Sequence, residues 1–389
     1  MNILVLTDTL PAPVLAKKVR ENDVLVVTAD MHEQLYDDVH YTFVFLLYTS
    51  FFTHFLSEHR EHKEFLDLKS YNLKNRKIEI IAVPTFVKSN IFWPLYMKIA
   101  FLRNRRKLTR IIKENKIDII HAQDVLTNLG LAYQINKYLK IPFVVTSRHL
   151  GRSDYIMPHV KKFISKAKGI INLGRNEKNL SAGLNPNSYL ISHGIDDRFL
   201  SKRKETYATD TLKIVTVSRL LFWKNIDKII LALDQIKEGF TWDIYGEGPH
   251  FDTLKDLVAQ SSISDKVVLH GHIDYEVIPE TLLNYDLFVL PSFPELFGRV
   301  YIEAMACGLA VIGARNTGMH GYITEGEQGF LVNHEEVSEL RDAIQRFISD
   351  KTLKVTMGKK AKVLSESFSW DSVINKLDQV YRSALGITK

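Results

Sequence analysis

Cysteine is almost absent from the sequence, since Cys307 is the single one in 389 residues. One cysteine cannot form an internal disulfide, so the fold does not rest on a disulfide framework, and the composition fits a reducing compartment. The sequence also lacks a D-x-D motif, an H-E-x-x-H motif and any cluster of cysteine and histidine. Because these are common signatures of metal sites, we expect no bound metal.

Long apolar runs are also missing, because no stretch of about 20 strongly apolar residues occurs. The nearest is 39–57, which is uncharged but contains two histidines and several Thr and Ser. We expect a buried strand there, followed by an aromatic surface segment. The start, M-N-I-L-V-L-T-D, has no basic region and is interrupted at Thr7 and Asp8. It therefore predicts a first strand rather than a secretory signal, and we expect a cytoplasmic protein.

Charge is distributed unevenly along the chain, whose net charge is +6. Residues 1–200 contain 29 Lys and Arg against 19 Asp and Glu, and residues 60–116 alone contain 15 basic and 5 acidic residues. The remainder of the chain is slightly acidic. A basic first half predicts contact with an anionic surface.

Short β-branched runs alternate with helical patterns along the whole chain. Such continuous apolar runs are typical of parallel strands that are covered on both faces. In the first half we predict strands at 3–7, 24–29, 78–83, 117–122, 143–147, 169–173 and 189–193, with helices at 93–115 and 126–139. In the second half we predict strands at 213–218, 242–246, 267–271, 287–291, 310–314 and 329–332, and helices at 225–238, 249–260, 276–284, 300–307 and 336–349.

The polar segment 201–211 interrupts this alternation and is the predicted linker. Two successive series of strands and helices predict an α/β protein with two doubly wound, Rossmann-like domains, at residues 1–200 and 212–369. Ligands of such sheets bind at the carboxyl ends of the strands. We therefore expect both domains to direct these loops toward a central cleft.

The stretch P-E-L-F-G-R-V-Y-I-E-A-M-A-C-G, residues 294–308, follows a predicted strand. Gly298 permits a tight turn, and the helix that follows presents free backbone N–H groups that can bind an anion. Glu295 and Glu303 flank this turn, and carboxylates accept hydrogen bonds from sugar hydroxyls. The pair suits a ligand that joins sugar, phosphate and ribose. An N-terminal helix cap plus an exposed helical glutamate is the alternative.

Two cations follow another predicted strand, Arg219 at its end and Lys224 five residues later. Together they can clamp a diphosphate, although a solvated surface pair has the same pattern. In Y-G-E-G-P, residues 245–249, the glycines Gly246 and Gly248 permit either approach of a ligand or a tight turn. The spacing does not match the G-x-G-x-x-G signature of dinucleotide binding.

These motifs, taken in order, resemble those of the family-4 retaining glycosyltransferases, which have the GT-B fold. The resemblance covers most of the second half: the Arg–Lys pair, Y-G-E-G-P, V-L-H-G, V-L-P-S and two glutamates separated by seven residues. F-S-W-D, residues 368–371, and the helix after it resemble the family's tail. Residues 370–389 are therefore expected to return to the first domain.

The resemblance implies transfer of a sugar from a nucleotide-sugar, expected to be a UDP-sugar, to a glycan or lipid-linked acceptor, with retained anomeric configuration. Cell-surface polysaccharide or glycolipid synthesis is the expected setting. No resident cofactor is expected, because the nucleotide-sugar is a substrate, and fixed cations would replace a metal. A sugar-nucleotide epimerase of the same fold and a non-catalytic nucleotide-binding protein at a membrane surface remain alternatives.

The resemblance also implies residue roles. The implied donor-binding residues are Arg219, Lys224, Gly246, Gly271, His272, Glu295, Phe297, Gly298, Arg299 and Glu303. Among these, Arg219 and Lys224 would hold the diphosphate, Glu295 the sugar and Glu303 the ribose. His121, in H-A-Q-D, would lie near the reacting sugar, so the implied catalytic residues are His121, Arg219, Lys224 and Glu295. His149 and His193 lie in loops that match acceptor-side loops.

The sequence departs from the family pattern in three loops. The first strand–helix turn, residues 7–14, has no glycine pair. His320 and Gly321 stand where the family has Pro and Glu, and His193 stands where it has Asn. The acceptor, the linkage and the oligomeric state are not encoded in the motifs that match.

The segment 91–113 mixes aromatic residues with Lys and Arg, which on a helix places a basic strip beside an apolar face. This pattern is typical of a helix that lies at a membrane surface. Nucleic-acid binding and an ordinary solvated helix are the alternatives, but no nucleic-acid-reading motif accompanies the charge. We expect peripheral contact with the inner face of a membrane, and no nucleic-acid partner.

Overall fold

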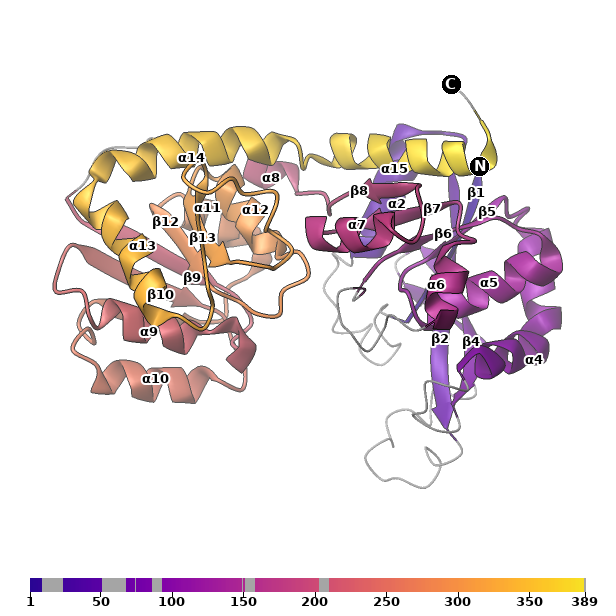
Figure 1. The fold of residues 1–389 in the computed structure, drawn as a ribbon, viewed down its shortest axis with the longest axis horizontal. Helices are drawn as coiled ribbons and strands as arrows, with labels where there is room; N and C mark the ends of the chain where they lie inside the picture. Colours follow the sequence, from indigo (N-terminus) through magenta and orange to yellow (C-terminus); the bar gives the residue numbers. More distant parts are fainter. Residues whose placement is uncertain are drawn as a thin grey trace. The chain divides into compact units, whose positions relative to one another are not determined.

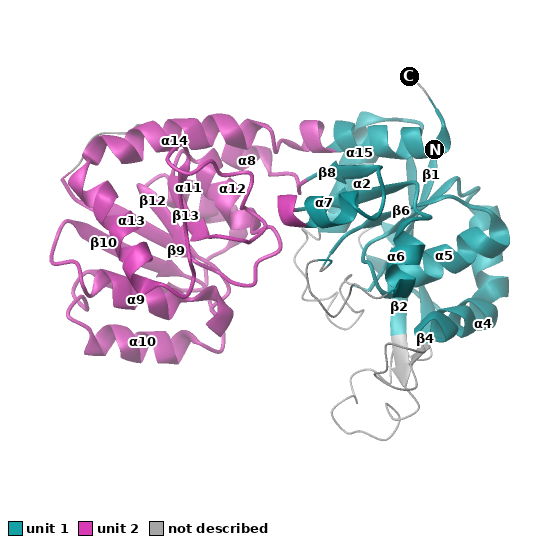
Figure 2. Cartoon of the chain, in the orientation of Figure 1, with its two compact units in different colours: residues 1–173, 177–191, 374–389 teal, residues 174–176, 192–373 magenta. Residues whose placement is uncertain are grey.

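The structure is a computed structural model that describes residues 1–8, 24–50, 68–73, 75–85, 93–148, 150, 158–202 and 210–387. The chain forms two compact units, shown in different colours in Figure 2. Unit 1 comprises residues 1–173, 177–191 and 374–389, and unit 2 comprises 174–176 and 192–373. Most of the predicted linker lies outside the described residues.

Unit 1 is built on an eight-stranded sheet with the order β3-β4-β2-β1-β5-β6-β7-β8 (Figure 1). The pairing of β3 with β4 is antiparallel, and the other neighbours are parallel. The strands are β1 (Asn2–Thr7), β2 (His40–Ser50), β3 (Ser70–Leu73), β4 (Arg76–Thr85), β5 (Ile119–Ala122), β6 (Phe143–Thr146), β7 (Gly169–Asn172) and β8 (Ser188–Leu190).

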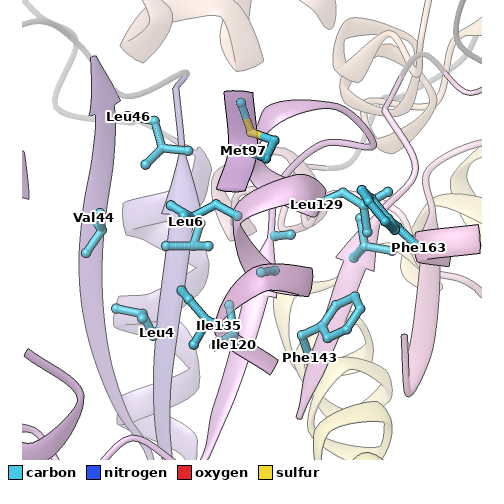
Figure 3. Packing of buried hydrophobic residues seen from close by; sticks show 14 of the residues in the cluster. Leu4, Leu6, Val44, Leu46, Met97, Ile120, Leu129, Ile135, Phe143 and Phe163 are labelled. Carbon is cyan, nitrogen blue, oxygen red and sulfur yellow. The ribbon is translucent and has the colours of Figure 1, made fainter. Parts of the chain in front are cut away.

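Apolar side chains on one face of this sheet pack against long helices. The helices that begin in this half of the chain are α2 (Val24–Leu35), α4 (Trp93–Glu114), α5 (Thr127–Leu139), α6 (Pro158–Ile164) and α7 (Arg175–Ala182). Figure 3 shows Leu6, Met97, Ile120, Leu129 and Phe143 meeting in one core. Burial of this continuous apolar cluster fixes the sheet, and with it the positions of the loops at the strand ends.

The predicted strand at 24–29 is wrong, because these residues begin helix α2. The run is rich in β-branched residues, which favoured a strand. Its buried residues, however, are Val26, Ala29 and His32. A spacing of three is the period of a helix, and the polar residues that follow continue it.

Unit 2 contains a six-stranded parallel sheet with the order β11-β10-β9-β12-β13-β14. The strands are β9 (Leu212–Val217), β10 (Phe240–Tyr245), β11 (Val267–Gly271), β12 (Leu287–Leu290), β13 (Ala310–Ala314) and β14 (Gly329–Val332). The helices are α8 (Asp197–Leu200), η4 (Phe222–Lys224), α9 (Ile226–Leu233), α10 (Phe251–Gln260), η5 (Tyr275–Val277), α11 (Ile278–Leu282), α12 (Arg299–Ala306), α13 (Val337–Ser349) and α14 (Lys351–Glu366). The predicted strands of this half agree with the structure, whereas α14 has no counterpart in the prediction.

The last helix, α15 (Trp370–Leu385), joins unit 1 from Ile374 onward, which confirms the predicted return of the C-terminal helix. Its side chains meet buried polar groups of unit 1. Asp378 accepts a hydrogen bond from Arg382 and lies 3.2 Å from the Nε2 atom of His32. Burial, the largest effect, lowers the pKa of His32 despite this carboxylate. None of the described helices is both long and apolar enough to cross a bilayer.

A buried ion pair attaches α14 to the sheet of unit 2. Lys354 Nζ lies 2.9 Å from Asp286 Oδ2, and the two side chains are 3% and 11% exposed. The same carboxylate accepts a hydrogen bond from the backbone N–H of Lys213, at the edge of β9. Asp286 therefore ties together a helix and a strand that are far apart in sequence.

Replacing Lys354 with Met should leave the Asp286 carboxylate buried without its cation, at a cost of about 3–5 kcal/mol in unfolding free energy. Lys351→Met is the matched control, because its ion pair with Asp210 is exposed. Urea unfolding followed by circular dichroism should show a large drop in midpoint for the first variant and almost none for the control. Equal shifts would show that the buried pair is not the attachment of α14.

Candidate functional site

The predicted ligand-binding residues of unit 2 gather where its strand order reverses direction. Strand β9 lies between β10 and β12, so the loops after β9 and β12 diverge from neighbouring strand ends. Ligands of open α/β sheets bind at such a point. Arg219 and Lys224 follow β9, and Glu295 and Gly298 follow β12. The topology therefore brings together residues that are about 70 positions apart.

Lys224 and Glu295 form the central contact, with 2.6 Å between Nζ and Oε2. The two side chains are only 17% and 15% exposed. Ser292 Oγ donates to the same carboxylate oxygen at 3.1 Å. The backbones of the two loops are also joined, because Phe293 N donates to Trp223 O. An ammonium and a carboxylate are thus held side by side, each with hydrogen-bonding capacity left for a ligand.

The turn at Gly298 begins helix α12. Its φ of +74° is in the left-handed region, and a Cβ added there would meet the ring of Tyr301. Glycine is therefore required, and the first N–H groups of α12 point out of the helix as at any helix start. Phe297, just before the turn, is buried against His193, Tyr322 and Phe368. The turn offers backbone donors and a positive helix end next to Lys224.

Glu303 is buried, with an exposed fraction of 5%. Its Oε1 atom accepts a hydrogen bond from Tyr275 Oη at 3.1 Å, and Arg299 Nη2 lies 3.7 Å away. Burial, the dominant effect, raises the pKa of Glu303, although Arg299 and Tyr275 act against it. The alternative of an exposed helical glutamate is therefore excluded. Tyr275 has no recognisable pattern in the sequence, so this partner was not predicted.

The remaining predicted donor residues lie around this centre. Arg219 is exposed, and no hydrogen bond or ion pair engages its side chain within the described part of the chain. Gly246 packs against the backbone of Ser218, so its lack of a side chain permits contact between two loops. Gly271 has a φ of +73° with open space around it, and His272 is exposed and lies 3.2 Å from Asp274.

The histidines predicted to act in the first half have different surroundings. His193 belongs to unit 2, is half-buried and meets Phe297 edge to face at 5.6 Å. His149 and most of the first turn lie outside the described residues. His121 lies in the interior of unit 1, only 4% exposed. Their roles toward a ligand stay predictions.

His121 is enclosed in a hydrogen-bond network. Its Nδ1 atom lies 2.6 Å from the Tyr381 hydroxyl, and Nε2 lies 2.8 Å from Thr146 Oγ1. Burial lowers the pKa of His121 to about 3, and Arg148 contributes in the same direction. With both nitrogens engaged, the neutral ring joins β5, β6 and α15. This environment gives no support to a direct contact with a sugar.

A second polar group, missed by the sequence analysis, lies at the strand ends of unit 1. Strand β1 lies between β2 and β5, so the order reverses there too. Asp8 follows β1 and Asp124 follows β5. Burial, and then Asp8, raises the pKa of Asp124 to about 7. A carboxylate within two residues of the end of each of two apolar strands was the signal that could have located this pair.

The described side chains were also compared with the geometry of metal sites. No group of three or more His, Cys, Asp or Glu within the described ranges is arranged to hold a metal ion. Arg219 and Lys224 are the cationic side chains that the sequence predicted for the candidate site.

Comparisons with known proteins match both halves of the chain. The family described as "Glycosyltransferase Family 4" matches residues 24–199, and "Glycosyl transferases group 1" matches residues 197–364. The two matches together extend over most of the sequence, in the order that the motifs predict. The chain belongs to the family-4 glycosyltransferases.

Relatives of this glycosyltransferase extend over most of its length. N-acetyl-alpha-D-glucosaminyl L-malate synthase of Bacillus anthracis is 26% identical over an alignment of 302 positions, and the match covers 72% of this chain and 78% of the relative. Alpha-D-kanosaminyltransferase of Streptomyces kanamyceticus is 26% identical over an alignment of 352 positions, and the match covers 79% of this chain and 88% of the relative.

Solved structures confirm the GT-B fold of the glycosyltransferase. Anabaena HepE in complex with UDP has a TM-score of 0.71 at 18% identity, and the match covers 98% of this chain and 100% of HepE. Sucrose-phosphate synthase of Thermosynechococcus elongatus has a TM-score of 0.69 at 18% identity, with 100% of each chain covered.

The loop that contains His320 and Gly321, where the sequence departs from the family pattern, supports the backbone of Glu295. Gly318 N donates to the backbone oxygen of Glu295 at 3.0 Å, and a Cβ on Gly318 would meet Leu296 O. His320 Nδ1 accepts from Asn316 N at 3.1 Å. His320 therefore stabilises its own turn, while the glycine allows that turn to pack against the Glu295 segment.

The buried His121 predicts how the stability of the glycosyltransferase depends on pH. Its pKa is about 3 in the folded state and about 6.5 when unfolded, so between these values the unfolded chain binds the extra proton. The contribution is present above pH 6.5 and is lost as the pH falls toward 3. His32, whose pKa is also lowered, acts in the same direction.

Urea unfolding of the wild type should therefore show a midpoint that falls below about pH 6.5. His121→Gln should reduce this slope, by up to about 1.4 kcal/mol per pH unit. The exposed His40 provides the control variant His40→Gln, which should keep the wild-type slope. An unchanged slope in His121→Gln would show that His121 does not titrate as its burial requires.

Proposed function

We propose that this glycosyltransferase moves a sugar from a UDP-sugar to a glycan or lipid-linked acceptor, with the anomeric configuration retained. The observation that carries the proposal is the Lys224–Glu295 pair beside the start of α12, at the reversal point of the unit 2 sheet. A cation and helix amides, which are suited to a diphosphate, lie there next to a carboxylate, which is suited to sugar hydroxyls. HepE, of the same fold, binds UDP according to its solved complexes.

The catalytic step requires stabilisation of a leaving group. The bond between the anomeric carbon and the phosphate oxygen breaks, and its electron pair stays on the departing UDP. Lys224, Arg219 and the α12 amides would receive this growing negative charge, which is the role that a metal ion has in other transferases. The acceptor oxygen would attack from the same face and pass its proton to the departing phosphate oxygen. No separate base is then needed, which suits the buried His121.

Each half of the donor has a proposed partner. Glu295 would accept hydrogen bonds from hydroxyls of a hexose, and Glu303 from those of the ribose. The backbone around Gly271 and His272 would hold the base. The acceptor would bind at the strand ends of unit 1, where Asp8 and Asp124 can accept hydrogen bonds from its hydroxyl groups.

We also propose that α4 contacts an anionic membrane surface, at the inner face of the membrane. Leu95 and Leu102 of α4 are 51% and 49% exposed, although its opposite face is buried in the unit 1 core. The exposed cations of the same helix are Lys98, Arg103, Arg105, Arg106, Arg110 and Lys113. Exposed leucines among cations are suited to the headgroup region of anionic lipids, where a lipid-linked acceptor would be found.

The donor site predicts a loss of activity without loss of folding. Lys224→Ala and Glu295→Gln should each lower kcat/KM for the UDP-sugar by about 100- to 1000-fold, because each removes a group that acts on the reacting diphosphate or sugar. Lys255→Ala and Glu238→Gln change exposed residues of the same unit and should retain activity. Full activity in EDTA is also expected. Unchanged turnover in either site variant would contradict the proposed site.

The base can be identified by thermal unfolding in the presence of nucleotides. UDP should raise the midpoint more than ADP or GDP at the same concentration, because a ligand that binds only the folded state stabilises it by mass action. Stronger stabilisation by ADP or GDP would contradict the UDP-sugar and would indicate an ADP-sugar or a GDP-sugar as the donor.

The membrane proposal predicts salt-sensitive binding to vesicles. Each Lys or Arg near an anionic bilayer contributes about 1 kcal/mol. The double variant Arg103→Gln/Arg106→Gln should therefore reduce co-sedimentation with phosphatidylglycerol vesicles by roughly 10- to 30-fold. Lys255→Gln/Lys359→Gln removes the same charge from unit 2 and should bind like the wild type. Equal loss in both, or no binding of the wild type, would exclude α4 as a membrane contact.

A further inference from the structure

Tyr275 lies at the centre of a charged cluster in unit 2. Its hydroxyl donates to Glu303 Oε1 at 3.1 Å and accepts a hydrogen bond from Arg299 Nη2 at 3.1 Å. The guanidinium groups of Arg198 and Arg299 lie 5.6 Å and 5.9 Å from its ring centre. Phe199 of α8 packs against the ring at 5.6 Å. The Tyr275 side chain therefore contacts both the Glu303 carboxylate and the Arg299 guanidinium.

The hydrogen bond between Tyr275 and Glu303 joins two segments that are far apart in the sequence. Tyr275 begins η5, four residues after Gly271, in the segment proposed to hold the base. Its target, Glu303, is on α12, the helix whose start is proposed to hold the phosphates. The hydroxyl therefore joins two segments of the proposed nucleotide site. Within the described chain no other hydrogen bond engages the Glu303 carboxylate, so Oε2 remains an acceptor for a ligand.

The charge of Glu303 depends on its neighbours. Burial raises its pKa and Asp196 acts in the same direction, whereas Arg299 and the Tyr275 hydrogen bond lower it. Asp196 is itself paired with Arg198, which also contacts Glu276. The Cys307 thiol also faces Glu303, and burial raises its pKa to about 12, so it is neutral. Lys202, Glu280 and Lys362 face Cys307. Tyr275 is thus one of two groups that favour the ionised carboxylate.

We propose that Tyr275 is a positioning residue of the nucleotide site, which orients Glu303 and keeps it a charged acceptor for the ribose hydroxyls. This inference rests on the proposed role of Glu303. Removal of the Tyr275 hydroxyl leaves Arg299 too far for a good hydrogen bond, since 3.7 Å exceeds the usual length. The carboxylate then loses its orientation, and its protonated form becomes more favourable.

The test is Tyr275→Phe, measured by calorimetric titration with UDP and with 2′,3′-dideoxy-UDP from about pH 5 to pH 8. UDP binding should weaken about 3- to 10-fold at neutral pH, the range for a hydrogen bond that orients a charged group. Binding of the dideoxy analogue, which lacks the ribose hydroxyls, should not change. The acid-side loss of UDP binding should move to higher pH, because the variant raises the pKa of Glu303.

Tyr285→Phe is the matched control, since its hydroxyl bonds to Tyr245 in the same unit, 2.8 Å away, and not to Glu303. It should bind both nucleotides like the wild type at every pH. Equal weakening of both nucleotides in Tyr275→Phe, together with a lower unfolding midpoint, would show a purely structural tyrosine and overturn the inference.

Glu303→Gln separates this inference from the function on which it rests. If Glu303→Gln binds UDP as tightly as the wild type, the proposed ribose contact is wrong. If Glu303→Gln weakens UDP binding but Tyr275→Phe keeps the wild-type affinity and pH profile, the ribose contact stands and the role of Tyr275 is overturned. Weakening of UDP alone in both variants, with a shifted pH profile in Tyr275→Phe, supports both.

Discussion

The ion pair of Lys224 with Glu295 is the interaction on which the proposed donor site of this glycosyltransferase depends. It joins the loop after β9 to the loop after β12, next to the point where the sheet reverses its strand order. Parallel pairing places the carboxyl ends of these strands together, and the backbone bond from Phe293 to Trp223 fixes the separation of the loops. The order of the strands thus decides which distant residues can act on one ligand.

The two carboxylates of this proposed site, Glu295 and Glu303, have different electrostatic surroundings. Lys224 and Glu295 are partly exposed and compensate each other's charge, so neither is an unpaired charge in the interior, and in the proposed site a diphosphate and a sugar would share them. Glu303 is buried, and its carboxylate relies on Tyr275 and Arg299 to oppose the cost of burial. In the proposed site, a polar ligand would meet one carboxylate that is paired with a lysine and one that is hydrogen-bonded to a tyrosine.

The fold could be predicted from the sequence, because it depends on local signals, whereas the ligand-binding roles of the unit 2 residues stay predictions. Apolar runs, a glycine before a helix and charged residues at strand ends can all be recognised in the sequence. Gly298 has the positive φ that a tight turn before a helix requires. The strand prediction at 24–29 failed, because the buried side of this run recurs every third residue and the run is helical. The enclosure of His121 by Tyr381, which is 260 positions away, is not visible in the local sequence, and the role of His121 toward a ligand stays a prediction. Tyr275 was missed because its partners, Glu303 and Arg299, come from another element.

A crystal structure of the full chain with UDP bound would test the central claim most directly. The account predicts that the diphosphate lies on the first amides of α12 within hydrogen-bond distance of Lys224 Nζ, and that both ribose hydroxyls contact the Glu303 carboxylate. UDP bound at any other edge of the unit 2 sheet, or with its ribose away from Glu303, would contradict it.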